Sequence, residues 1–159
     1  MKKLTLALAF LFAWISAHAA TVTVDFSTLT PVAGQTITAD VKVNNVFSGI
    51  ISEFLIGFGF NFVNGNPGVL NFVGATLGPA FVSSGAAGAN VAAFTNAIPG
   101  LAPGDFIEPL LLATLTFQAV AAGTSTAGAS TTVPGNPDHG LFFDGGTTLD
   151  INATQLISV

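Results

Sequence analysis

The chain has 159 residues, half of them hydrophobic and only 7% charged, far below the roughly 25% of an average soluble protein. It contains 15 Phe and 18 Gly but no Cys, which excludes disulfide bonds, a thiolate zinc site, a cysteine nucleophile and a lipid-bearing cysteine. Three Lys and no Arg exclude a surface that follows nucleic-acid phosphates, because such binding needs clustered positive charge.

The first 19 residues have the pattern of a secretory signal peptide. Two lysines precede an apolar run over residues 4–15, and Ala17-His18-Ala19 is a small-x-small cleavage site. The run is shorter than the about 20 residues that a membrane-spanning helix needs. We therefore expect cleavage after Ala19 or Ala20, a secreted or cell-surface mature chain without a transmembrane anchor, and one domain over residues 20–159.

After residue 20, apolar and polar residues alternate, which is typical of strands that bury one face. Turn sequences rich in Gly, Pro and Asn separate these runs, and Asn64-Gly65-Asn66-Pro67-Gly68 is the clearest of them. We expect strands over residues 21–26, 36–44, 54–62, 69–76, 91–97, 111–119 and 149–157, and a loop or weak edge strand over residues 123–130.

The run from Phe54 to Phe62 is the most informative of these strands. Side chains at alternate positions share one face of a strand, so four Phe and one Ile would face the core, and Gly57 and Gly59 would lie opposite. Glycines and β-branched residues at this density are poor helix formers. Strands without a convincing helix predict an all-β fold, an antiparallel β-sandwich.

Several segments resemble the cohesin family and its relatives in exported bacterial proteins. VAGQTITADV at residues 32–41 resembles the family's G-(D/Q)-T-(V/I)-T-V-x-V opening, and residues 51–62 resemble its ISGFDFSLSYD strand. GVLNFVGA at residues 68–75 is similar to PSVLEFVSV, and LATLTFQA at residues 112–119 is similar to LATLTFKV. The resemblance covers essentially the whole mature chain. It departs after the aromatic strand, where the family often has Tyr-Asp-Pro and this chain has FVNGNPG at residues 62–68.

The resemblance implies a jelly-roll sandwich of about 8–9 strands and non-catalytic binding, which for cellulosomal cohesins means binding of dockerin modules through one sheet face. An extracellular protein, dockerin-like or another surface protein, is therefore the first expected partner. A polysaccharide is the second, because the fold is related to some carbohydrate-binding modules. A self-assembling surface or matrix subunit is a third alternative, since low charge with many Thr, Val and Phe permits association between sheet edges.

One apolar set is a candidate partner-binding face. Leu55, Gly57, Gly59, Leu112 and Val120 lie opposite the positions that the alternation assigns to the core. If no loop covers them, they form a flat apolar patch of the kind that marks an interface.

Aromatic residues offer less support for polysaccharide binding. Exposed Trp and Tyr usually contact flat polysaccharides, and the mature chain has neither. Phe47, Phe81, Phe94 and Phe106 lie near loops and are the Phe residues that could be exposed.

Enzyme chemistry has little support in the sequence. Catalysis needs convergent titratable groups, and the mature chain has one His, His139, which we expect to be a solvated loop residue, and no G-x-S-x-G motif. No cofactor is required. Calcium is the one inorganic candidate, because Asp138, Asp144, Asp150 and Asn152 supply oxygen ligands within a short stretch of chain.

Overall fold

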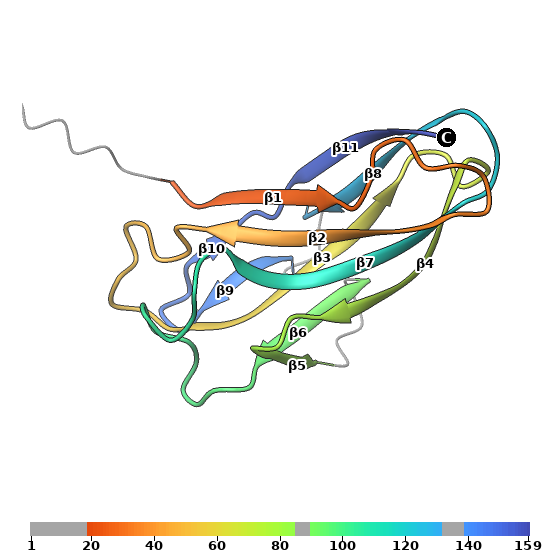
Figure 1. Cartoon of the computed structure of the whole chain (residues 1–159). Helices are drawn as coiled ribbons and strands as arrows, with labels where there is room; N and C mark the ends of the chain where they lie inside the picture. The colour runs from red at the N-terminus through yellow and green to blue at the C-terminus, as the bar shows by residue number, and fades with distance from the viewer. Residues whose placement is uncertain (1–18, 85–89, 132–138) are drawn as a thin grey trace, which may run out of the picture.

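The computed structural model describes residues 19–84, 90–131 and 139–159, which form eleven β-strands in two antiparallel sheets and no helix (Figure 1). The strands are β1 (Thr21–Phe26), β2 (Thr36–Asn44), β3 (Leu55–Asn64), β4 (Leu70–Leu77), β5 (Phe81–Ser83), β6 (Val91–Thr95), β7 (Leu110–Ala119), β8 (Thr124–Ser130), β9 (Gly140–Phe143), β10 (Thr148–Leu149) and β11 (Ala153–Ser158). The predicted β-sandwich is confirmed. None of the described residues belongs to a helix that is long and apolar enough to cross a membrane.

The smaller sheet has four strands in the order β1-β2-β7-β4. Its strand β2 follows the predicted alternation closely: Ile37, Ala39, Val41 and Val43 are buried, and the polar residues between them face solvent. A strand with this period-two pattern is stable only when its apolar side lies against another layer, which here is the second sheet.

The larger sheet is built around β3. The N-terminal half of β3 pairs with β6 on one side and with β9 on the other, and its C-terminal residues Asn61 to Asn64 pair with β8. The register continues from Ser130 opposite Asn61 to Gly140 opposite Gly59, so β8 and β9 are two halves of one interrupted strand. The next position in the sheet is also divided between two strands: β10 pairs with β9, and β11 pairs with β8. The segment of residues 123–130 is therefore an internal strand, not a loop or an edge.

Phenylalanine rings fill the space between the sheets. Phe58 and Phe60 of β3 and Phe117 of β7 are completely or almost completely buried. Phe117 contacts Phe72 of β4 at a ring-centroid distance of 5.6 Å, and Phe72 stacks on Phe62 of β3 at 3.8 Å. Aromatic pairs at such distances add about 0.5–1.5 kcal/mol each beyond the area they bury, so they join the two sheets.

Two β-bulges shift residues away from their predicted faces. On β3, Ile56 has no partner in β9, because Leu55 pairs with Phe143 and Gly57 with Phe142. On β7, Leu112 is the extra residue between Ala113 and Leu111. An extra residue breaks the period of two. As a result Leu55 and Leu112 are fully buried in the core, and the expectation that they lie opposite the core-facing positions is wrong.

Candidate functional site

The outer face of the larger sheet exposes one apolar row across four strands. The register aligns Val82 of β5, Phe94 of β6, Gly57 of β3 and Phe142 of β9. Residues that are direct partners in neighbouring strands share a face. Val82 and Phe94 are about half-exposed, and no residue of β3, β5, β6, β9 or β10 is charged.

Gly57 has no side chain, so the centre of this row does not project from the sheet. A Cβ atom at Gly57 would lie 2.5 Å from the backbone oxygen of Ala93 and 3.2 Å from Cδ1 of Phe94. The Phe94 ring therefore leans over bare backbone, where a side chain would collide with it. The row is a shallow apolar surface between two aromatic side chains.

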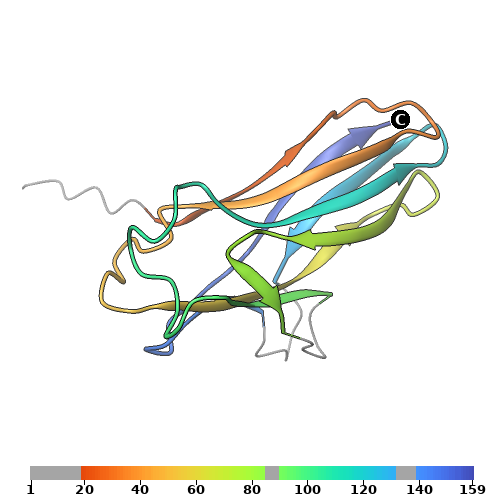
Figure 2. The ribbon, with the colours of Figure 1, turned by 60° about the horizontal axis from the view of Figure 1, so that its bottom comes forward.

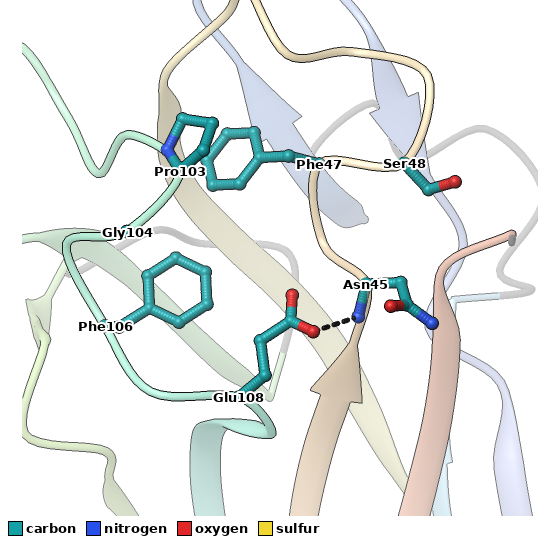
Figure 3. A pocket seen from close by; sticks show the side chains of 7 residues that line it. All are labelled: Asn45, Phe47, Ser48, Pro103, Gly104, Phe106 and Glu108. Carbon is teal, nitrogen blue, oxygen red and sulfur yellow. Dashed lines mark hydrogen bonds between the residues drawn. The ribbon is translucent and has the colours of Figure 1, made fainter.

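A second candidate lies at one end of the sandwich, where the β2–β3 loop (residues 45–54) meets the β6–β7 loop (residues 96–109). Both loops lie at the left in Figures 1 and 2. They enclose an open depression of about 440 Å³ lined by Asn45, Phe47, Ser48, Pro103, Gly104, Phe106 and Glu108. Figure 3 shows Phe47, Pro103, Phe106 and Glu108 around this depression.

Glu108 joins the two loops around this depression. Its Oε2 accepts a hydrogen bond from the backbone N–H of Asn45 at 2.8 Å, and its Oε1 accepts one from Val46 at 3.0 Å. Asn45 has a positive φ of 54°, so the chain turns sharply there and both N–H groups face the carboxylate. Phe47 then packs against Phe106 at a centroid distance of 6.0 Å. Both carboxylate oxygens of Glu108 are thus used to hold the two loops together. A ligand in the depression would therefore mainly contact the aromatic side chains.

The β9–β10 turn is fastened to the same end of the molecule. Phe54 N–H donates to Oδ1 of Asp144 at 2.8 Å, and Asp144 N–H donates to the Phe54 oxygen at 3.0 Å. Thr147 donates its hydroxyl to Oε1 of Glu53 at 2.8 Å, whereas the buried Oε2 of Glu53 has no hydrogen-bond partner.

The structure does not bring the five predicted partner-binding residues together. Gly57 and Gly59 lie in the middle of the larger sheet, Leu55 and Leu112 are in the core, and Val120 is exposed just after β7 of the smaller sheet. Of the four Phe residues near loops, Phe94 is exposed, Phe106 is half-buried, and Phe47 and Phe81 are buried.

The predicted calcium ligands are also engaged elsewhere. Asp144 binds the backbone of Phe54, whereas Asp150 and Asn152 accept hydrogen bonds from Thr131 and Ser130. Asp138 lies outside the described residues. Within residues 19–84, 90–131 and 139–159, no three acidic or His side chains form a group that could hold a metal ion.

His139 is buried, so its expected role as a solvated loop residue is wrong. Its Nδ1 lies 3.1 Å from the backbone oxygen of Thr131, beside the interruption between β8 and β9. Burial of this residue follows from pairing of the strand halves, which no local sequence pattern indicates.

The lysine of the mature chain lies on the outer face of the smaller sheet. Lys42 Nζ is 3.1 Å from Asp25 and 3.2 Å from Asp40. The hydrogen bond with Asp25 is the main cause that raises the pKa of Lys42 above its ordinary value of 10.5; desolvation opposes it, and the hydrogen bond and charge of Asp40 add to it. This ion-pair cluster links β1 to β2, and Lys42 lies three residues before Asn45, which lines the depression.

Sequence reasoning missed Val82 and Glu108. Val82 is in a three-residue strand that is too short for an alternation pattern. Glu108 had one available signal: it is a charged residue in a chain with very few, placed two residues before an apolar strand.

No model of a known protein family matches the chain, and no curated protein matches it. Solved cohesin structures match its fold. A type II cohesin domain from the cellulosome of Acetivibrio cellulolyticus has 16% sequence identity and a TM-score of 0.53, over 87% of this chain and 94% of that one. The second type II cohesin module of the adaptor scaffoldin ScaA from the same organism has 19% identity and a TM-score of 0.55, over 85% of each chain.

A third match is a cohesin solved with a partner. It is a type II cohesin from a cohesin–X–dockerin complex of A. cellulolyticus, with 19% identity and a TM-score of 0.51 over 87% of this chain and 98% of that one. The chain therefore forms a cohesin-like domain, and the fold implied by the sequence resemblance is confirmed. At these identities the likeness concerns the fold alone.

Proposed function

We propose that the mature chain, residues 20–159, is an exported, non-catalytic module that binds another protein through the outer face of the larger sheet. The cohesin-like fold supports a binding role, since a matching solved structure is a cohesin in complex with a dockerin. The signal-peptide pattern of residues 1–19 supports export.

The exposed apolar row is the observation on which this proposal rests. Val82 and Phe94 stand half-exposed on a sheet face without any charged residue, with Gly57 between Phe94 and Phe142. Aromatic residues are enriched where protein interfaces bury their core, and Lys and Glu are depleted. Contact over such a face depends on shape and apolar area, so its affinity changes little with salt.

A dockerin-type protein is the first partner to test. The experiment uses the mature chain as bait in the secreted and envelope fraction of the producing organism, followed by binding measurements with the purified partner. Phe94→Asp places a charge in the row, and Val73→Asp is the matched control, because Val73 is similarly exposed (59% against 54%) but lies on β4 of the other sheet.

We expect one stoichiometric protein, captured equally well by wild type and V73D and at least about tenfold more weakly by F94D, the effect of losing about 1.4 kcal/mol. Affinity should be similar in about 0.1 M and about 1 M NaCl, between which the Debye length falls from about 10 to about 3 Å. Equal binding by F94D would contradict the choice of face. Retention on insoluble polysaccharide without any bound protein would replace the protein partner by a polysaccharide.

A further inference from the structure

Among the strands that the structure describes, β4 forms a long free edge of the sandwich. It ends the order β1-β2-β7-β4 and pairs with β7 alone. At the opposite edge of this sheet, β1 lies beside β11 of the larger sheet in Figures 1 and 2. Two other strands that end a sheet, β5 and β10, have three and two residues. β4 has eight, so it is the edge along which another strand has room to pair.

The backbone of β4 directs hydrogen-bonding groups away from the sheet. Gly78, just after the strand, donates its N–H to an oxygen of β7 at 2.8 Å. Alternate residues of an antiparallel ladder face the same neighbour, so Gly74 and Thr76 also face β7. Ala75 and Leu77, at the intervening positions, therefore direct their N–H and C=O groups outward. Within the residues that the structure describes, no group bonds to the backbone of Ala75 or Leu77 on this side.

Ala75 marks a gap in the cover of the core. It pairs with the fully buried Leu115, so its side chain points to the core side of the sheet, yet it is exposed. Leu77 has the same orientation and is partly buried against the core. An apolar side chain from a strand added to this edge would cover Ala75 and extend the core.

No charged side chain protects this edge. The sequence has no charged residue between Glu53 and Asp105, a stretch that includes all of β3 to β6. Edge strands are commonly protected from pairing by charged residues, by proline or by a bulge. The bulge of β4 lies between Phe72 and Gly74, so residues 74–77 are regular and lack all three kinds of protection.

We propose that β4 pairs with β4 of a second copy, antiparallel and about a two-fold axis at Thr76. This register places Ala75 of each copy opposite Leu77 of the other, and each such pair exchanges both of its N–H···O bonds. Leu77 would then cover the exposed Ala75, and Thr76 would form a Thr–Thr pair across the axis. Gly74 would lie opposite Gly78, where no side chains collide. The edge is thus complementary to itself in size and in hydrogen bonding, which favours a second copy over a strand of another protein.

This contact closes on itself, because a two-fold axis uses the same edge of both copies. It joins the two four-stranded sheets into one continuous sheet. The contact involves the edge of the smaller sheet and not the outer face of the larger sheet, so it is independent of the protein partner proposed above.

The first test is sedimentation velocity of the mature chain from about 10 μM to about 1 mM in about 0.5 M NaCl. The salt screens the formal charge of −7, which makes copies repel each other. We expect the average mass to rise to that of two copies and no further. A monomer at every concentration would refute the proposal, and growth beyond two copies would contradict the two-fold contact.

The second test removes one outward N–H. Ala75→Pro deletes this donor, and an edge strand tolerates Pro where its N–H faces solvent, so pairing with β7 is retained. We expect A75P to dimerise at least about tenfold more weakly than wild type. Ala75→Ser is the matched control, because it keeps the N–H. Phe94→Asp, on the larger sheet, should also dimerise as wild type does. Equal dimerisation by A75P and A75S would contradict the pairing.

Amide hydrogen exchange of the wild-type chain, followed by NMR, is a third test that needs no variant. The amides of Ala75 and Leu77 should exchange more slowly as the protein concentration rises, because pairing protects them. Those of Gly74 and Thr76, which face β7, should not change with concentration. Dimerisation without protection of Ala75 and Leu77 would place the contact elsewhere and overturn the inference.

Discussion

Removal of the Glu108 carboxylate should loosen the contact between the β2–β3 and β6–β7 loops by an amount that the structure allows us to estimate. A hydrogen bond to a charged group contributes about 1.5–3 kcal/mol when shielded from water. Val46 is fully buried, so its bond to Glu108 should contribute about 1.5 kcal/mol. Asn45 and Glu108 are exposed, so their 2.8 Å bond should contribute only about 0.5 kcal/mol after solvent screening.

Glu108→Ala should therefore lower the free energy of unfolding by about 2 kcal/mol. For a chain of this size that is a decrease in Tm of about 8 °C. Glu108→Gln should cost about half as much, because its single oxygen still accepts one N–H while its amide group faces the other. The assay is thermal and urea unfolding of the mature chain followed by circular dichroism.

Asp105→Asn is the matched control for Glu108→Gln, since both remove one negative charge from the same loop. Among the residues that the structure describes, Asp105 accepts only the N–H of Ala102, three residues away, so D105N should remain within about 0.5 kcal/mol of wild type. If E108A and D105N unfold together with wild type, the two loops are not joined by this carboxylate and the reasoning fails.

Four other predictions concern the core, the row, the ion pairs and calcium. Phe117→Ala should lower the free energy of unfolding by about 3–5 kcal/mol in urea titrations, because its ring is fully buried between the sheets. Gly57→Ala should lower it by about 1–3 kcal/mol in the same assay, since the added methyl group meets the Ala93 oxygen. The pKa of Lys42 is raised by Asp25, so its stabilising effect is complete below the ordinary pKa of 10.5 and is lost as pH rises through the folded-state pKa; unfolding curves of Lys42→Met should lack this alkaline loss. Asp144, Asp150 and Asn152 already accept hydrogen bonds from protein groups, so calcium and a chelator should give the same Tm, whereas a higher Tm with calcium would support the calcium site predicted from the sequence.

Much of the fold is predictable because strand alternation is a local property. The alternation on β2 identifies every buried residue of that strand from its sequence. Prediction failed where a single extra residue changed the period. Ile56 and Leu112 are unpaired in bulges, and residues on the two sides of each bulge no longer alternate between the faces of the sheet as predicted. Bulges depend on the strand that lies opposite, which a single sequence window does not contain.

The candidate surfaces were harder to predict for a related reason. Gly57 could be placed on an outer face from its own strand, but its neighbours Val82, Phe94 and Phe142 come from three other strands. Glu108 binds backbone groups 62 and 63 residues earlier in the chain. Contacts over such separations follow from the topology of the whole sandwich, so composition and spacing near each residue cannot reveal them.

The strands β1 and β11 run in the same direction, and Figure 1 places the start of β1 and the C-terminus at opposite ends of the sandwich. Tension applied between these two points would act along the strands. It would load all six residue pairs of the β1–β2 ladder and all six of the β11–β8 ladder in shear at once, instead of separating them pair by pair. The domain is thus oriented to resist pulling along its chain, with the hydrogen bonds of each terminal strand sharing the load.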